Sequence, residues 1–491
     1  MNVSASVIYV YGWLFAFMAL AMLVPIGFAF AYNEPKVVQA FIVTALATGF
    51  LGVAIVFALK GQNTKHTRRQ SLFLLGTVWF ILPCVAALPF YLAQTPNTLL
   101  QAYFEAVSGL TTTGATIFVD LSEIPKSIIV WRALIQWIGG FITLLSLVAI
   151  LAPVIMADAF DNKFRQVRQT LPAAHRQLFE TLPKIFPIYA LLTLTCFLFL
   201  LIAKIPAFDA FCLSLSTVST GGFMPRPGSI SLYGSPFAEF VLTVFMFLGA
   251  VSILWVKQMV EFKWRNLLKV REPMWIAGII FGLGSMLAIR LLLDAPSAEL
   301  SAISHTFTLG LATAASFVST TGFVVSDRTQ DILPFTVVIM ICILGGGRMS
   351  TAGGLKFFRF SAMLGQSGRE LVQLIFPHGV QQARYSTQNH NSLVMRSVWA
   401  NFAVMMITMW LLAALIAVTG LPLSASLLAA LSSISNIGPA YSLTALPDLT
   451  IAQSYAAMHP GAHAALCLGM ILGRVEILAL LSLLNIAYWR S

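Results

Sequence analysis

Ten apolar runs divide the chain, and shorter polar stretches separate them. Most of the runs exceed the roughly 20 residues that an α-helix needs to cross a hydrocarbon layer about 30 Å thick. We therefore predict an all-α integral membrane protein with ten transmembrane helices. The runs span residues 7–32, 37–59, 72–94, 128–157, 185–203, 237–256, 273–293, 332–344, 393–418 and 462–489.

The composition supports this pattern. Of the 491 residues, 58% are apolar and 10% are charged, which is far from the balance of a soluble domain. The first run lacks a basic leading segment and is longer than the apolar part of a signal peptide, so we expect it to be retained. The five cysteines show no paired spacing, so the sequence predicts no disulfide framework, no metal site of their making and no covalent cofactor.

The charges are distributed unevenly along the connecting stretches. Lys and Arg concentrate around residues 60–69, 163–184, 257–271 and 356–396, whereas the intervening stretches are mainly acidic. Because positive residues near helix ends mark the cytoplasmic side, both termini are predicted to be cytoplasmic. The net charge of +11 therefore indicates topology and contact with anionic membrane lipid, and not nucleic-acid binding.

A short motif recurs four times, with a glycine at its centre. Gly114, Gly222, Gly322 and Gly438 are spaced by 100 to 116 residues. A half-apolar stretch of about a dozen residues precedes each motif and is too short to cross a membrane. The four motifs read LTTTGA (110–115), VSTGGF (218–223), VSTTGF (318–323) and ISNIGP (434–439), and the preceding stretches are 98–108, 207–215, 304–315 and 424–434.

This arrangement predicts four half-helices that enter the membrane and turn back at the motif. Irregular backbone at membrane depth is tolerated only beside protein or a water-filled cavity, so the four loops should converge on one axis. Rings of backbone carbonyls select cations in pores, and glycine permits the required backbone turn. The predicted filter consists of Thr111, Thr112, Thr113, Gly114, Ser219, Thr220, Gly221, Gly222, Ser319, Thr320, Thr321, Gly322, Ser435, Asn436, Ile437 and Gly438.

At these residues the chain resembles the Trk/Ktr/HKT superfamily of K+ transporters, in particular its bacterial TrkH type. The resemblance also rests on QWIGG (136–140), GGLK (353–356) and GRVE (473–476). It implies four helix, pore-loop, helix modules in a pseudo-fourfold arrangement around one ion pore, after two additional N-terminal helices. The implied divisions are 1–62 for the additional helices and 70–160, 180–265, 272–365 and 390–491 for the modules.

The resemblance narrows the transported ion to K+. In the superfamily a glycine in all four loops accompanies K+ preference, whereas a serine in the first loop accompanies Na+ transport in some plant members. The first position here is Gly114. The resemblance further implies a homodimer in the bacterial inner membrane, with a cytoplasmic nucleotide-binding ring like TrkA as regulatory partner.

A glycine-rich stretch is predicted to interrupt the second span of the third module. Each glycine costs about 1 kcal/mol relative to alanine inside a helix, and five lie close together here. The order of residues is not that of a phosphate-binding loop. The resemblance implies a gate below the filter, to which Arg474 adds an electrostatic barrier; the gate residues are Gly345, Gly346, Gly347, Arg348, Ser350, Thr351, Gly353, Gly354, Lys356 and Arg474.

Other functions remain open at this point. A Na+/K+ transporter, or a symporter that couples K+ to H+ or Na+, would fit the same repeats, although the sequence shows no clear proton relay. An integral membrane enzyme is disfavoured, because no carboxylate pair or Ser-His constellation with plausible spacing occurs in the apolar segments. Arg474 could alternatively pair with a neighbouring carbonyl and have no barrier role.

Overall fold

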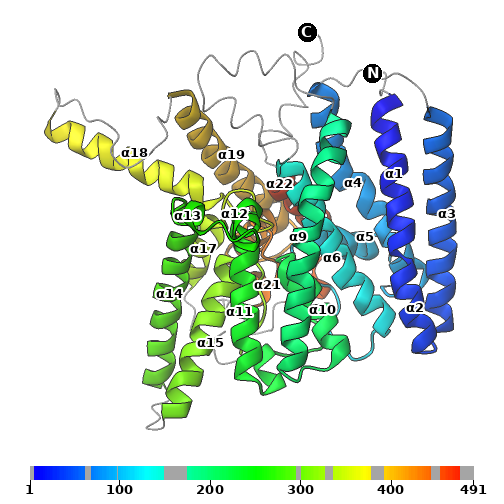
Figure 1. Ribbon diagram of the computed structural model, residues 1–491, viewed down its shortest axis with the longest axis horizontal. Coiled ribbons are helices and arrows are strands. Elements are labelled where there is room, and N and C mark those ends of the chain that lie inside the picture. Colours follow the sequence, from blue (N-terminus) through cyan, green and yellow to red (C-terminus); the bar gives the residue numbers. More distant parts are fainter. Residues whose placement is uncertain are drawn as a thin grey trace.

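The computed structural model describes residues 5–60, 68–96, 98–148, 174–294, 300–326, 335–376, 392–443 and 454–475. Within these ranges the regular secondary structure is entirely helical (Figure 1). The predicted all-α class is confirmed for this part of the chain.

Seven helices of the described part are long and apolar enough to cross a membrane. They coincide with seven of the ten predicted runs. The helices are α1 with α2 (Ala5–Ala21 and Leu23–Ala31, counted as one span), α3 (Pro35–Leu59), α4 (Arg68–Leu92), α6 (Lys126–Ser146), α9 (Ala174–Ile202), α14 (Glu272–Asp294) and α19 (Ser392–Ala417).

The run 237–256, predicted as one transmembrane helix, is broken in the structure. It forms α11 (Pro236–Ala250) and α12 (Ile253–Val260), which meet at 115°. At the bend the carbonyl oxygen of Ala250 accepts a hydrogen bond from Gly347 in another segment.

The two remaining runs contain shorter helices in the described part. These helices are α17 (Phe335–Leu344) and α22 (Pro460–Val475). Residues 476–491, including the Glu476 of the GRVE motif, lie outside the described residues.

Four short helices correspond to the predicted half-helices, and each ends at one glycine motif. They are α5 (Leu99–Leu110), α10 (Ala207–Val218), α15 (Leu300–Val318) and α20 (Leu423–Ile434). The hydroxyl of Thr98 caps α5 by accepting from the backbone N–H of Gln101 at 3.3 Å. α15 begins four residues before the predicted start and is the longest of the four.

Four short elements and the 19-residue helix α18 complete the described secondary structure. Figure 1 shows α18 projecting sideways from the bundle. These elements are η2 (Ile230–Tyr233), α13 (Trp264–Leu267), α18 (Phe357–Ile375), α21 (Pro439–Leu443) and η3 (Tyr455–Ala457).

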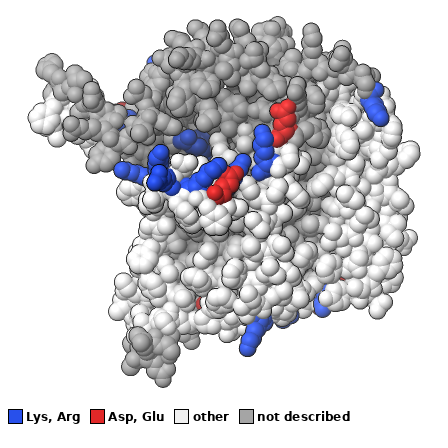
Figure 2. Space-filling view, viewed as in Figure 1, with Lys and Arg blue, Asp and Glu red and all other residues white. Residues whose placement is uncertain are grey.

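Large apolar side chains cover the outside of the bundle. Phe50 on α3 is 79% exposed, and Ile289 on α14 and Leu411 on α19 are also exposed. Figure 2 shows a broad face almost free of charge, with Lys, Arg and a few acidic side chains in a band near its upper edge and some further Lys and Arg at its lower edge. Such a surface would promote aggregation in water but suits contact with lipid. In contrast, α6 is buried along nearly its whole length and forms part of the centre of the bundle.

Candidate functional site

The four glycine motifs share an unusual backbone conformation. The residue two positions before each central glycine has a positive φ: 50° at Thr112, 54° at Thr220, 62° at Thr320 and 53° at Asn436. Non-glycine residues rarely adopt this conformation. In the first three loops the central glycine also has a positive φ, between 75° and 84°. In each of the first three loops, residues in the left-handed conformation therefore alternate with residues in other conformations. This alternation turns successive carbonyl groups toward the same side, which a carbonyl-lined ion path requires.

The motifs contact one another in chain order and close into a ring. A Cβ atom at Gly114 would overlap the carbonyl oxygen of Gly221, and one at Gly222 would overlap the carbonyl oxygen of Thr321. Gly322 faces Pro439 of the fourth loop. The backbone N–H of Gly438 donates to the carbonyl oxygen of Thr113 at 2.6 Å and so joins the fourth loop to the first. Glycine is therefore required in these places for close packing as well as for φ.

The fourth loop departs from the common pattern. Gly438 does not have a positive φ, and Pro439 begins α21 directly after it. The hydroxyl of Tyr455 donates to the carbonyl oxygen of Gly438 at 2.7 Å. Burial raises the pKa of Tyr455 well above its ordinary value, so the hydroxyl remains a donor at physiological pH.

The hydroxyl and amide side chains of the loops stabilise the backbone. Thr111 donates to the carbonyl of Val107 at 2.7 Å, and its hydroxyl also pairs with that of Thr113 at 2.7 Å. The amide of Asn436 donates to the hydroxyl of Thr113 at 2.9 Å and to the carbonyl of Met470 at 3.0 Å. These side chains are buried. They fix the loops, whereas the buried side-chain oxygens of Thr112, Ser435 and Asn436 Oδ1 have no hydrogen-bond partner within the described part of the chain.

The glycine-rich stretch between α17 and α18 is a non-helical loop, as predicted. We call residues 345–356 the gate loop, after the role that the sequence resemblance implies for them. Gly345, Met349, Gly354 and Lys356 all have positive φ values between 56° and 73°. The hydroxyl of Ser350 donates to the carbonyl of Gly347 at 2.7 Å and closes a turn within the loop.

The gate loop lies directly against three of the four motifs. The N–H of Gly353 donates to the hydroxyl of Thr320 at 2.7 Å, and the hydroxyls of Thr220 and Thr351 are 3.1 Å apart. A Cβ atom at Gly353 would overlap the carbonyl oxygen of Ser435. The loop is therefore packed against the ring and cannot leave without breaking these contacts.

Arg474 connects the gate loop to the first motif. Its Nε donates to the carbonyl oxygen of Thr111 at 2.7 Å, and its Nη1 donates to the carbonyl oxygen of Thr351. The side chain is buried, with 8% exposed. A charged donor makes stronger hydrogen bonds than a neutral one, so this bridge is an important attachment of the loop.

The other side of the gate loop is attached to the bend between α11 and α12. Gly347 donates to the carbonyl of Ala250 at 2.8 Å, and Ile253 donates to the carbonyl of Met349 at 3.1 Å. The N–H of Arg348 donates to a carboxylate oxygen of Glu272 at 2.7 Å.

The side chains of Arg348 and Lys356, the other two predicted basic gate residues, make different contacts. The guanidinium of Arg348 lies 3.7 Å from the ring centroid of Phe358, and Lys356 donates to the carbonyls of Ser350 and Ala352 within the loop. Lys356 thus stabilises the fold of the loop itself.

Comparison with known proteins identifies the family. A sequence profile of the TrkH family, described as a cation transport protein, matches residues 34–272 and 285–488. The chain belongs to the TrkH family. It is 28% identical over 468 residues to the Trk system potassium uptake protein TrkH of Salmonella typhimurium, covering 90% of this chain and 92% of that protein. It is 27% identical over 491 residues to the protein of the same name from Vibrio parahaemolyticus, covering 99% of both.

A solved structure agrees over the whole chain. The crystal structure of the potassium transporter TrkH from Vibrio parahaemolyticus superimposes with a TM-score of 0.84, at 26% sequence identity and full coverage of both chains. The resemblance noted in the sequence is thus confirmed as family membership, and the overall fold is that of a TrkH protein.

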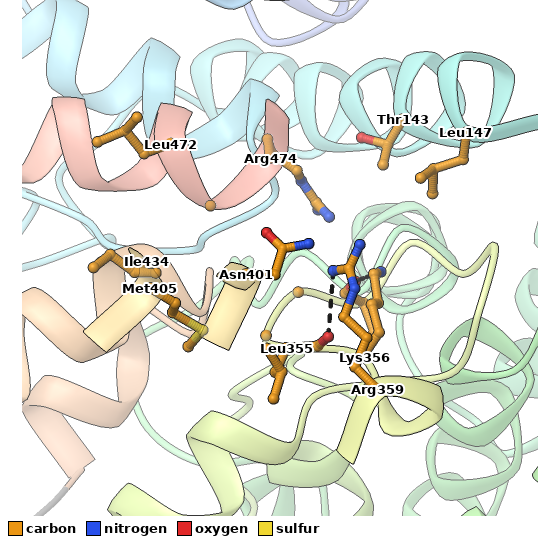
Figure 3. A pocket seen from close by; sticks show the side chains of 14 residues that line it. Thr143, Leu147, Leu355, Lys356, Arg359, Asn401, Met405, Ile434, Leu472 and Arg474 are labelled. Carbon is orange, nitrogen blue, oxygen red and sulfur yellow. Dashed lines mark hydrogen bonds between the residues drawn. The ribbon is translucent and has the colours of Figure 1, made fainter. Parts of the chain in front are cut away.

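A cationic pocket lies beside the gate loop in this TrkH-family chain (Figure 3). Three of its lining side chains are basic, namely Lys356, Arg359 and Arg474, and none of its lining residues is acidic. Arg359 approaches the carbonyl of Leu355 at 3.5 Å. A cation that enters this pocket therefore meets positive charge.

Several residues around the ring were not singled out from the sequence as site residues. The amide nitrogen of Gln136 donates to the carbonyl of Gly221 at 2.7 Å, and its oxygen accepts from the hydroxyl of Ser216 at 2.8 Å. Glu105 and Arg132 form a buried ion pair behind the first loop. The sequence offers a signal for this pair, because a charged residue within an apolar segment costs free energy to bury and therefore suggests a specific role. The role of Gln136 depends on tertiary contacts that no local pattern indicates.

Proposed function

We propose that this chain takes up K+ through a pore lined by the four glycine motifs. The closed ring of the motifs carries the proposal, because four carbonyl-bearing loops around one centre can replace the hydration shell of a cation. Family membership and the names of the relatives, which are potassium uptake proteins, support K+ as the ion.

The proposed architecture has ten spans. Two N-terminal helices (1–62) precede modules at 70–160, 180–265, 272–365 and 390–491, arranged with pseudo-fourfold symmetry around the pore. The short helices α5, α10, α15 and α20 direct the partial negative charge of their C-terminal ends to the ring, which favours cations.

The proposed gate is the gate loop together with Arg474. Contacts of the loop with Thr220, Thr320 and Ser435 support a closed arrangement, and Arg474 adds positive charge beside it. Opening requires the loop to move away from the ring. The hydrogen bonds to Ala250 and Ile253 couple the loop to the bend between α11 and α12, so that a movement of the bend would displace the loop.

We further propose a homodimer in the inner membrane, with both termini in the cytoplasm and a TrkA-like nucleotide-binding ring as regulatory partner. The name "Trk system" of the relatives supports a multi-component assembly. The segment 253–271, which contains α12 and α13, is suited to the docking of such a ring, because it is basic, largely exposed and hydrogen-bonded to the gate loop. Its basic residues are Lys257, Lys263, Arg265, Lys269 and Arg271.

Ion flux into liposomes that contain the purified protein tests the proposal. Uptake of K+ and Rb+ should exceed uptake of Na+, and alanine substitutions at Gly114, Gly222 and Gly322 should abolish or alter it. If none of these substitutions changes the ion flux, the proposal that the motifs line the pore is contradicted. If the flux depends on a pH or Na+ gradient at fixed voltage, the protein is a symporter and uptake is not passive.

A further inference from the structure

The ion pair between Glu105 on α5 and Arg132 on α6 has no role in the function proposed above. Arg132 Nε lies 2.7 Å from Glu105 Oε1, and the two side chains are 1% and 0% exposed. Removing two charges from solvent costs several kcal/mol per ion, and a buried pair is weak evidence of a gain in stability. Because stability does not account for the pair, we infer its role from the residues that it contacts.

Both carboxylate oxygens of Glu105 hold the segment that leaves the first loop. Oε1 also accepts from the hydroxyl of Thr116 at 3.1 Å, and Oε2 accepts from the backbone N–H of Ile117 at 3.2 Å. Arg132 Nη2 donates to the hydroxyl of Thr116 at 2.9 Å. Thr116 and Ile117 follow Gly114 by two and three residues. The ion pair thus fixes the exit of the first loop.

The same guanidinium contacts the second loop. It lies 4.1 Å from the ring centroid of Phe223, the residue directly after Gly222, and 5.2 Å from that of Phe118. A desolvated cation over an aromatic face is attracted to it. Arg132 therefore lies between the first and second loops and holds both.

No ionisable residue stands at the position of Glu105 in the other three repeats, although the second repeat has a different ion pair, between the buried Asp209 on α10 and Arg226, whose side chain is 57% exposed. Glu105 precedes Gly114 by nine residues, and the equivalent positions in the other three repeats are Leu213, Thr313 and Ala429. None of these can form an ion pair. A structural requirement common to all four loops would not explain why only the first has this pair. We therefore look for its purpose at the contact between the first and second loops.

We propose that Glu105 and Arg132 are positioning residues for ion selectivity. The pair sets the separation of the first and second loops, whose backbones already touch at Gly114 and Gly221. If the pair is lost, the two loops gain freedom, the cage of carbonyls can contract, and a smaller ion such as Na+ is accepted more readily. The inference rests on the proposed cation uptake and specifies residues that give it selectivity.

The test compares ⁸⁶Rb+ with ²²Na+ uptake into proteoliposomes. Glu105→Gln and Arg132→Met should each lower the Rb+ to Na+ uptake ratio at least tenfold, and the double variant should be no worse than the more harmful single variant, because the two residues act as one unit. Arg132→Lys should rescue the ratio only in part, since an ammonium cannot bridge Glu105, Thr116 and Phe223 together.

Two further variants keep the test decisive. Arg290→Met removes an arginine from an exposed Arg290–Asp294 pair on α14 and should leave the ratio unchanged. Thr116→Val keeps both charges and removes only the shared hydroxyl, so it replaces the charge variants if these fail to fold, and it should lower the ratio as well.

A wild-type ratio in folded Glu105→Gln, Arg132→Met or Thr116→Val protein, even with slower uptake, would overturn the inference and leave only a structural role. If the wild-type protein itself shows no preference for Rb+, the proposed function fails instead. The two failures are therefore distinguishable in one set of measurements.

Discussion

Replacement of Thr351 by Val removes one hydroxyl from the gate loop and preserves the branched shape of the side chain. The hydroxyl donates to the carbonyl of Gly249 at 3.1 Å and accepts from the hydroxyl of Thr220 at 3.1 Å. Thr351 is buried. The substitution therefore removes two hydrogen bonds that attach the gate loop to α11 and to the second motif.

The size of the effect follows from these two bonds. A neutral hydrogen bond contributes about 0.5–1.5 kcal/mol net, so the loss of both weakens the closed arrangement by about 1–3 kcal/mol. Each 1.4 kcal/mol corresponds to about a tenfold change in an equilibrium constant. We therefore expect the uptake rate of Thr351→Val to rise by roughly 5- to 100-fold, provided that closure limits the rate in the wild type.

Uptake of ⁸⁶Rb+ into proteoliposomes at a fixed membrane potential measures the change. Thr351→Ser is the matched control, because it restores the hydroxyl and should return the rate to that of the wild type. The Rb+ to Na+ ratio should be the same in all three proteins, since the filter carbonyls are untouched. Unchanged or slower uptake by folded Thr351→Val protein would refute the idea that these bonds keep the gate closed.

Three further substitutions test other contacts. Gly114→Ser should raise Na+ uptake relative to K+, because its Cβ would displace the carbonyl of Gly221; an unchanged reversal potential under bi-ionic conditions would contradict this. Arg474→Gln should increase Rb+ uptake severalfold, and normal expression with unaltered uptake would exclude a barrier. Tyr455→Phe leaves the Gly438 carbonyl without its donor and should lower the melting temperature by about 1 °C in calorimetry, as for a loss of about 1 kcal/mol in a chain of this length; an unchanged melting temperature would exclude that contribution.

The sequence predicted the register of the four motifs because glycine is a local requirement. Gly114, Gly222 and Gly322 adopt positive φ and pack without room for a Cβ atom, and these demands leave a visible pattern in the residues. The broken helix before the gate loop was predictable for the same reason, since clustered glycines disfavour a helix wherever they occur. The positions that the motifs and the gate loop would occupy relative to each other were not predictable from spacing alone.

The features that sequence reasoning missed are those determined by partners far along the chain. The bend after Ala250 has no proline, and its freed carbonyl is satisfied by Gly347, almost a hundred residues later. In the sequence Gln136 is an ordinary polar residue within an apolar run, and its hydrogen bond to the carbonyl of Gly221 is visible only in the folded structure. The fourth motif was grouped with the others by its residues, yet Pro439 starts a helix and Gly438 takes a different conformation.

The location of a bound ion tests the central claim most directly. Diffraction from crystals soaked in Rb+ or Tl+ can place the ion by its anomalous signal. The account predicts a peak inside the ring of motifs, within coordination distance of backbone carbonyls from all four loops. A peak located elsewhere, or a ring that stays empty at saturating Rb+ while uptake proceeds in liposomes, would contradict the account.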